Sequence, residues 1–370
     1  MSLPAPIESR LLAMLHTRTD TLKPGDPIPE PLVLSSAFAL PSNPDAKRTY
    51  ARFTNPTIEA TEARLAALEA APCLLFPSGM GAYSAAFMAL LKSGDTVLML
   101  SDGYYAARNL VSEILAPFGV QLQTCPAADI LTADLAGYAA VVVETPSNPG
   151  LDVIDLRALA ERCRAAGAKL VVDNTVLTPL LQQPLDLGAD IVIVSDTKAM
   201  AGHTDVLMGH VASRDAAYME RLLSLRNLTG NIPAPYEAWL LLRGLETVEL
   251  RLARMCENAR AALPLLQASA AVREVIYPAP SPQALDQGFL IGATFASAAA
   301  ADRFLARAGF AQMTSFGGLH ASGDRRARWG DSVAEGFLRL SFGIEPTAAL
   351  TDALQAALAD ADTDADTPRP

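Results

Sequence analysis

Short apolar runs alternate with amphipathic stretches along the first two thirds of the chain. The apolar runs are rich in β-branched residues and have the length of buried strands. They lie at 73–76, 95–100, 139–144, 168–173 and 189–195. Helical periodicity appears between them, at 57–70, 80–94, 106–117 and 155–166. Buried strands that alternate with helices indicate a mostly parallel sheet with helices on both faces, and therefore the α/β class.

The pattern changes near residues 243 and 244, after which one long amphipathic helix is predicted over 245–268. The later apolar runs, at 273–278, 289–295, 311–316 and 337–343, predict a smaller α+β domain closed by a helix at 347–359. We expect a large domain over 50–243 and a C-terminal domain over 244–370, with a frayed acidic tail around 360–366. Residues 1–49 are rich in proline and are expected to form an extended arm.

Composition argues against several classes of function. The net charge of −11 opposes binding to nucleic acid or to an anionic membrane surface. The chain has no clean run of about 18 apolar residues, and its first residues lack the pattern of a secretory signal. The four cysteines are scattered and lack metal-ligand spacing, so we expect a reduced, cytoplasmic protein without a metal site.

A lysine stands unusually close to a predicted strand end. The strand ends at Ser195, and Lys198 follows with Thr197 beside it. Burial favours the neutral amine, which is the form that attacks a carbonyl to make a Schiff base. The two hydroxyls are suited to binding a phosphate. The alternative is an ordinary lysine whose amine extends into solvent.

Two other strand ends carry suitable chemistry. Asp173 ends the run 168–173, where a buried carboxylate needs a partner such as a protonated pyridine nitrogen. A helix N-cap or a structural hydrogen bond is its alternative. The turn Ser78-Gly79-Met80 opens a predicted helix, and free amides at a helix N-terminus bind phosphate. An ordinary tight turn is the alternative for this segment.

Three further side chains follow or lie in apolar runs. Tyr104 comes after the run 95–100 and is placed to stack on an aromatic cofactor. Asn148 stands between two prolines that stiffen its loop, where its amide can reach a phenolate oxygen or simply form a turn. Arg339 is a charge inside an apolar run, so it should meet either a ligand anion or a buried acid.

In this order the segments resemble a known family. The chain reads YxRxxNPT (50–57), SGM (78–80), DxY (102–104), ExPSNP (144–149), DN-T (173–175), S-x-T-K (195–198) and RLSxGxE (339–345). This series is similar to that of the Cys/Met-metabolism pyridoxal-phosphate enzymes, the transsulfuration family, from about residue 30 to residue 358. The resemblance implies the fold type I of pyridoxal-phosphate-dependent transferases, which is aspartate-aminotransferase-like, and an enzyme that acts on a small amino acid.

The resemblance also implies residue roles. Lys198 corresponds to the lysine that carries the cofactor as an internal aldimine and then acts as a base. Asp173 corresponds to the acid that pairs with the pyridine nitrogen, and Tyr104 to the tyrosine that stacks on the ring and assists proton transfer.

Other positions correspond to binding residues. The implied phosphate cradle consists of Gly79, Met80, Ser195 and Thr197. The implied contacts with the substrate carboxylate or the cofactor O3′ come from Asn148, Ser315 and Arg339. Tyr50 and Arg52 correspond to a pair that reaches the phosphate of a neighbouring subunit. A homodimer would then be the catalytic unit, commonly assembled into a tetramer.

One loop departs from the family pattern. In SFGGLHAS (315–322), His320 stands where a glutamate is usual, and three arginines follow in GDRRARWGD (323–331). We expect His320 and these arginines to alter recognition of the distal end of the substrate. The alternatives are a structural histidine and arginines that face solvent. No cysteine closely follows Tyr104, which counts against a methionine γ-lyase.

The favoured interpretation is a carbon–sulfur lyase, with cystathionine γ-lyase first. A cystathionine β-lyase, a cystathionine γ-synthase and an O-acylhomoserine sulfhydrylase remain alternatives. A non-catalytic homologue that binds pyridoxal phosphate is the remaining option, supported only by the altered loop.

Overall fold

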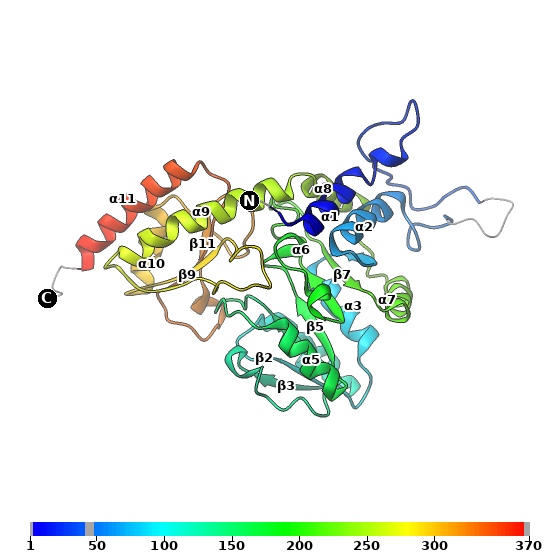
Figure 1. The fold of residues 1–370 in the computed structure, drawn as a ribbon, viewed down its shortest axis with the longest axis horizontal. Helices are drawn as coiled ribbons and strands as arrows, with labels where there is room; N and C mark the ends of the chain where they lie inside the picture. Colours follow the sequence, from blue (N-terminus) through cyan, green and yellow to red (C-terminus); the bar gives the residue numbers. More distant parts are fainter. Residues whose placement is uncertain (1–2, 41–47, 366–370) are drawn as a thin grey trace.

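The computed structural model describes residues 3–40 and 48–365, with side chains placed as far as Ala361. Its large domain contains a sheet with the strand order β1-β7-β6-β5-β4-β2-β3 (Figure 1). These strands are β1 Cys73–Phe76, β2 Thr96–Leu100, β3 Gln121–Cys125, β4 Ala140–Glu144, β5 Lys169–Asp173, β6 Ile191–Val194 and β7 Gly209–Ser213. Strand β7 runs antiparallel to β1 and β6, and the other neighbours are parallel. The predicted α/β class with a mostly parallel sheet is confirmed.

Helices bury both faces of this sheet. In β5, Val171 packs into the cluster formed with α3 and α7, whereas Leu170 and Val172 pack on the opposite side with α5. Strands covered on both faces need apolar residues at successive positions, which accounts for the continuous apolar runs. The helices of this domain are α2 Pro56–Glu69, α3 Gly79–Leu90, α4 Tyr105–Asn109, α5 Leu156–Ala166, α6 Thr178–Leu181, α7 Ala216–Thr229 and α8 Pro235–Leu245.

The C-terminal domain packs helices against a second sheet with the order β10-β11-β12-β9-β8. Its elements are α9 Val248–Ala268, β8 Val272–Ile276, β9 Leu290–Phe295, α10 Ala298–Arg307, β10 Ala311–Gln312, β11 Ser322–Arg325, β12 Phe337–Ser341 and α11 Thr347–Ala365. The predicted smaller α+β domain is therefore present. The strand expected over 311–316 is reduced to β10, and β11 arises in the atypical loop, where no strand was expected.

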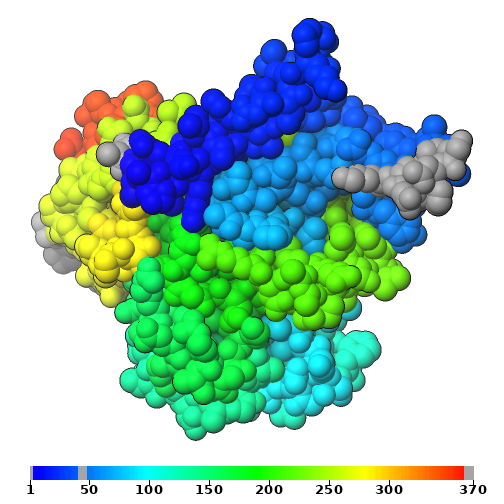
Figure 2. Space-filling view, turned by 45° about the vertical axis from the view of Figure 1, so that its right-hand side comes forward, coloured from blue at the N-terminus to red at the C-terminus, as the bar shows by residue number. Residues whose placement is uncertain are grey.

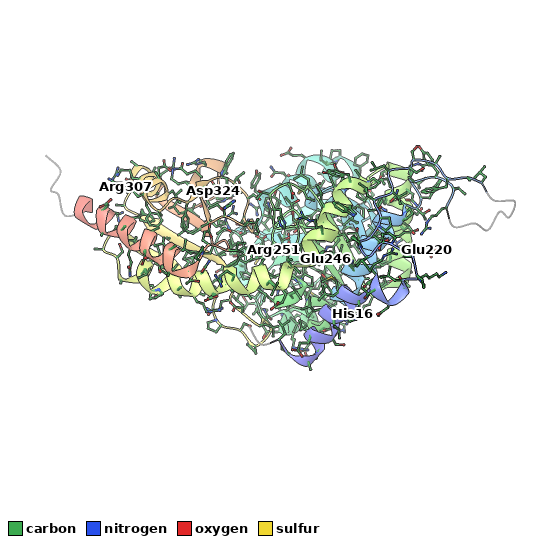
Figure 3. All side chains as sticks on the ribbon, turned by 90° about the horizontal axis from the view of Figure 1, so that it is seen from above. His16, Glu220, Glu246, Arg251, Arg307 and Asp324 are labelled. Atoms are coloured by element: carbon green, nitrogen blue, oxygen red, sulfur yellow. The ribbon has the colours of Figure 1, made fainter. Side chains whose placement is uncertain are left out.

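Helix α9 joins the two domains. Its residues up to Cys256 belong to the core of the large domain, and those from Ala259 belong to the core of the small domain. Figure 3 shows Arg251 near the middle of the molecule, on the part of α9 that lies against the large domain. The boundary predicted after residue 243 stays a prediction, because a single helix contributes to both cores.

The extended arm predicted over 1–49 is wrong for Ala5–His16, which form helix α1. Pro4 precedes the first turn, where the amide that proline lacks has no intrahelical partner in any case. Ile7 and Met14 are buried against the core that contains α2, and this packing stabilises the helix. In Figure 2 the first residues form a ridge over the outside of the large domain.

Two further expectations concern the tail and the membrane. Helix α11 continues to Ala365 rather than ending at 359, and the expected fraying of the acidic tail stays a prediction. The expectation for residues 366–370 lies outside the described part of the chain. Within the described residues, no helix is long and apolar enough to cross a membrane.

Helix α1 provides a matched stability test. Met14 is 0% exposed, whereas Leu12 on the same helix is 55% exposed. We expect Met14→Ala to lower the free energy of unfolding by about 2–5 kcal/mol, and Leu12→Ala to change it by less than about 0.5 kcal/mol. Urea unfolding followed by circular dichroism measures both. Equal effects of the two substitutions would contradict the docking of α1.

Candidate active site

A pocket lies where strand ends of the large domain meet the small domain. Its volume is about 350 Å³. The carboxyl ends of parallel strands meet at one sheet edge, which is where ligands bind in such folds. The predicted site residues that line it are Gly79, Met80, Tyr104, Asn148, Asp173, Ser195, Thr197, Lys198, Ser315 and Arg339. Of the predicted set, Tyr50, Arg52 and His320 do not line this pocket.

Lys198 extends its amine into this pocket. Its Nζ donates a hydrogen bond to Ser315 Oγ at 2.8 Å and lies 5.2 Å from the centre of the Phe316 ring. Burial and the guanidinium of Arg339 lower the pKa of Lys198 to about 8, although Asp173 acts in the opposite direction. The alternative of a lysine that extends into solvent is therefore wrong.

Ser315 holds an unusual backbone conformation. Its φ is +84°, in the left-handed region that residues with a side chain rarely adopt. This conformation directs Oγ to Lys198 while the carbonyl oxygen accepts from Arg339 at 3.1 Å. Local strain of this kind persists only where surrounding contacts fix the residue, as they do here.

Two buried carboxylates lie side by side in the pocket that Lys198 also lines. Asp173 and Glu144 are partners in the register of β5 and β4, so their side chains share one face of the sheet. Asp173 accepts from Tyr83 Oη at 2.8 Å and from the Thr175 amide at 2.8 Å. Burial raises the pKa of Asp173, and burial together with Asp173 raises the pKa of Glu144 well above its usual range. A cation placed beside this pair would relieve the cost of burying it.

The turn before α3 lies against the segment that carries Lys198. A side chain added at Gly79 would come within 2.8 Å of Ser195 Cβ, so only glycine permits this approach. Ser78 caps α3 by accepting from the Gly81 amide at 2.9 Å. The Ser195 amide donates to Thr175 Oγ1 at 2.8 Å. The N-terminus of α3 and the hydroxyl residues Ser195 and Thr197 thus line the same pocket, where they fit a phosphate.

Arg339 enters the pocket from β12 and is 3% exposed. It donates to Asn148 Oδ1 at 2.7 Å and to the Ser315 carbonyl at 3.1 Å. Its Nε is buried and finds no partner among the described residues. Both acceptors are neutral, and among the described residues Arg339 forms no direct ion pair with an acid, which favours a ligand anion over a buried acid as its partner. The Asn148 oxygen is occupied by Arg339, so a contact with a phenolate oxygen, which stays a prediction, would come from the Asn148 side-chain N–H groups.

The structure does not bring His320 into the pocket with the other predicted residues. His320 is exposed and lies outside the pocket lining. Arg326 and Trp329 of the same loop line the pocket instead. Strand β11 lies between position 320 and position 326, and the sequence pattern did not predict this strand.

The arginines of this loop are paired rather than free. Arg326 is buried and bonds to Asp324 at 3.0 Å and to Asp331 at 2.7 Å. The indole N–H of Trp329 also donates to Asp324, at 2.9 Å. Arg325 and Arg328 share Asp302 of α10, at 2.9 Å and 3.4 Å respectively.

Tyr50 and Arg52 lie on the outside of the large domain. Both are exposed, and Arg52 donates to the Asn227 carbonyl at 2.7 Å and lies over the Phe53 ring. Their predicted contact with the phosphate of a neighbouring subunit stays a prediction.

Several pocket residues were missed by sequence reasoning. Glu144 ends a strand as Asp173 does, so the same strand-end rule identifies it. Tyr83 lies inside α3 and contacts Asp173 only through the tertiary fold. Arg326 and Trp329 depend on the path of a loop that the sequence pattern did not predict.

Comparison with known proteins gives the family. The model of the "Cys/Met metabolism PLP-dependent enzyme" family matches residues 13–287. The chain belongs to this family. A putative cystathionine γ-lyase of Streptomyces coelicolor is 41% identical over 342 residues, which cover 88% of this chain and 87% of that protein. An L-methionine γ-lyase of Pseudomonas deceptionensis is 32% identical, with 93% of this chain and 96% of that protein covered.

The solved structures agree. Cystathionine γ-synthase from Xanthomonas oryzae pv. oryzae, in complex with aminoacrylate and cysteine, superposes with a TM-score of 0.89. It is 32% identical, and the match covers 96% of this chain and 98% of that chain. The predicted type I fold is thereby confirmed, and the protein is an enzyme of the transsulfuration family that depends on pyridoxal 5′-phosphate.

The residues of the pocket fit this cofactor. An amine with a lowered pKa suits its aldehyde, the α3 N-terminus suits its phosphate, and the buried carboxylate pair suits its pyridinium. The unpartnered Nε of Arg339 adds a buried donor for a substrate carboxylate.

The titration of Lys198 can be tested directly. The neutral amine is the nucleophile, so capture of pyridoxal phosphate by the apo protein should accelerate as the pH rises through about 8. Borohydride trapping at a series of pH values measures this rate, with Lys198→Ala as the blank. Arg339→Gln removes a like charge and should move the midpoint upward, whereas Asp173→Asn should move it downward. A parent midpoint near 10.5, the ordinary lysine value, would contradict the lowered pKa.

Proposed function

We propose that the protein is a cystathionine γ-lyase, which converts cystathionine and water to cysteine, 2-oxobutanoate and ammonia. The observation that carries the proposal is the convergence of Lys198, Asp173 and Arg339 on one pocket. The similarity to the S. coelicolor relative over 88% of this chain supports the assignment as a γ-lyase.

The roles of the residues follow from their contacts. Pyridoxal phosphate supplies a ring that accepts electron density when a proton leaves the substrate. Asp173 would hold the proton of the ring nitrogen, and Tyr83 orients Asp173 by hydrogen bonding. Gly79, Met80, Ser195 and Thr197 would hold the phosphate, and Tyr104 lines the pocket where the ring would stack.

Lys198 serves as the base. A γ-elimination requires proton removal at Cα and then at Cβ, so one base has to reach two neighbouring carbons. With a pKa of about 8, a substantial share of Lys198 is neutral near physiological pH. The Ser315 hydroxyl accepts from its Nζ and so limits where the amine points. Arg339 would bind the substrate α-carboxylate through its unpartnered Nε.

A cystathionine γ-synthase is the second candidate. The superposition with the X. oryzae enzyme over 96% of this chain favours it. Both activities require the same base and the same carboxylate site, so they differ in whether a thiol nucleophile or water completes the reaction.

We further propose a homodimer as the catalytic unit, assembled into a tetramer in the cytoplasm. The support is the exposed position of Tyr50 and Arg52, away from the pocket of their own chain. An exposed aromatic–arginine pair is suited to contacting the phosphate site of a second copy.

Product analysis tests the assignment. Purified protein given cystathionine should release cysteine and 2-oxobutanoate, as detected by chromatography and by a keto-acid assay. Lys198→Ala should lower turnover by about 100- to 10,000-fold, because it removes the base. Homocysteine and pyruvate would instead indicate a β-lyase, and activity only with an O-acylhomoserine plus a thiol would indicate a synthase.

Two residues of the atypical loop give a matched test of substrate recognition. Trp329 lines the pocket, whereas His320 is exposed outside it. We expect Trp329→Ala to lower kcat/KM for cystathionine about tenfold, and His320→Ala to change it less than about twofold. Steady-state kinetics with matched cofactor loading measures both. The opposite order would restore His320 as the recognition residue.

A further inference from the structure

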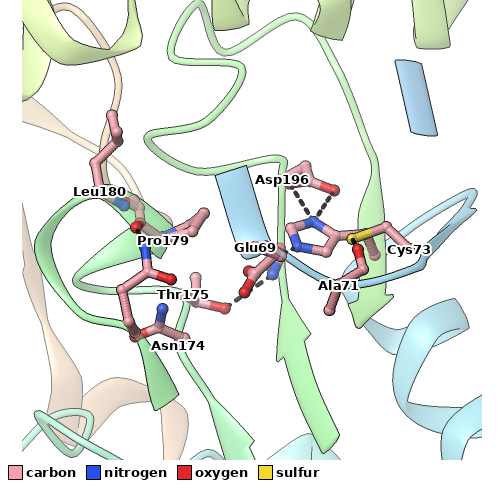
Figure 4. A network of polar contacts seen from close by, with 12 residues as sticks. Glu69, Ala71, Cys73, Asn174, Thr175, Pro179, Leu180 and Asp196 are labelled. Carbon is pink, nitrogen blue, oxygen red and sulfur yellow. Dashed lines mark hydrogen bonds and ion pairs between the residues drawn. The ribbon is translucent and has the colours of Figure 1, made fainter. Parts of the chain in front are cut away.

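A buried ionic network lies beside the segment that carries Lys198. The ring of His210 bonds through Nδ1 to the two carboxylate oxygens of Asp196, at 2.8 and 3.0 Å, and through Nε2 to Glu69 at 3.2 Å. All three side chains are fully buried. Figure 4 shows Asp196 and Glu69 around the imidazole ring, with dashed lines for these contacts.

The ring is a cation that holds two acids. Burial alone would lower the pKa of His210, but Asp196 and Glu69 outweigh this effect and raise it to about 10. Both ring nitrogens therefore donate over the physiological range. The contacts are unequal, since Asp196 uses both oxygens whereas Glu69 Oε2 is buried without a partner in the described residues.

Asp196 belongs to the turn that presents the lysine. It stands between Ser195 and Thr197, and its carbonyl accepts from the Ala201 amide at 2.9 Å. A buried carboxylate is tolerated only when it is paired. The inward direction of the Asp196 side chain, and with it the path of the turn, therefore depends on the imidazolium.

The strand that carries His210 also contacts the predicted phosphate end of the pocket. His210 lies opposite Val194 in the β6–β7 register. The preceding residue, Gly209, packs so closely that an added Cβ would come within 2.7 Å of Gly79 Cα. Strand β7 thus contacts the turn before α3 through Gly209 and bonds to Asp196, in the turn that carries Lys198, through His210.

We propose that His210 is a positioning residue, which fixes the Ser195–Lys198 turn through Asp196 and so sets cofactor affinity. Glu69, at the end of α2, holds the other side of the ring and contributes less to the direction of the turn. The proposal rests on the proposed role of Lys198.

Two substitutions separate the two ring contacts. An asparagine amide can take the place of Nδ1, and a glutamine amide can take the place of Nε2. His210→Asn therefore keeps a donor for Asp196, whereas His210→Gln keeps one for Glu69. Both remove the buried positive charge, so both should lower the thermal midpoint.

The readouts are the dissociation constant of pyridoxal phosphate for the apo protein and amide hydrogen exchange over residues 196–202. We expect His210→Gln to raise the dissociation constant at least about tenfold and to speed exchange in this segment. His210→Asn should stay within about threefold of the parent in affinity. Asn258→Ala, a buried polar change in the small domain, controls for general destabilisation.

Equal cofactor affinity in the parent, His210→Asn and His210→Gln proteins would overturn the proposal, even if both variants unfold at lower temperature. If neither histidine variant folds, Asp196→Asn and Glu69→Gln make the same comparison, and only the former should weaken binding. Failure of the proposed function is separate. Full turnover by Lys198→Ala would remove the function and leave a difference in hydrogen exchange between the histidine variants intact.

Discussion

A lysine amine must be able to lose its proton near physiological pH in a pocket that also buries two carboxylates, and much of the structure serves this requirement. Burial and Arg339 favour the neutral form, and Asp173 opposes it. The carboxylates alone would favour a charged lysine. Arg339 therefore has a second effect besides offering an N–H to an anion, because its charge balances that of the acids. The lysine, the arginine and the acid pair act as one electrostatic unit.

The fold brings this unit together from distant parts of the sequence. Parallel strands deliver Glu144, Asp173 and the Lys198 turn to one sheet edge. The small domain supplies Arg339 and Ser315, which contact Asn148 and Lys198 across the domain junction. The lining of the pocket thus combines residues of both domains, including Arg326 and Trp329 of the atypical loop.

The strand-end residues were predictable from sequence because a polar side chain directly after a buried apolar run is costly unless it meets a partner or a ligand. Lys198, Asp173 and Asn148 were found in this way. The errors arose where the local pattern does not determine the path of the chain. Helix α1 depends on packing by Ile7 and Met14 rather than on local periodicity, and the loop places Arg326 and Trp329, not His320, in the pocket. Tyr83 could not be found, because its partner is 90 residues away.

Helix α9 joins the two domains and also contacts the surroundings of both Lys198 and Arg339. Arg251 donates to the Ala199 and Met200 carbonyls, directly after Lys198, while the far end of the same helix packs in the core that supports β12 and Arg339. A tilt of this one helix would redirect the amine and shift the guanidinium at the same time. The placement of Arg339 relative to Lys198 therefore depends in part on this one helix, which contacts the segment after the lysine and the core beneath the arginine.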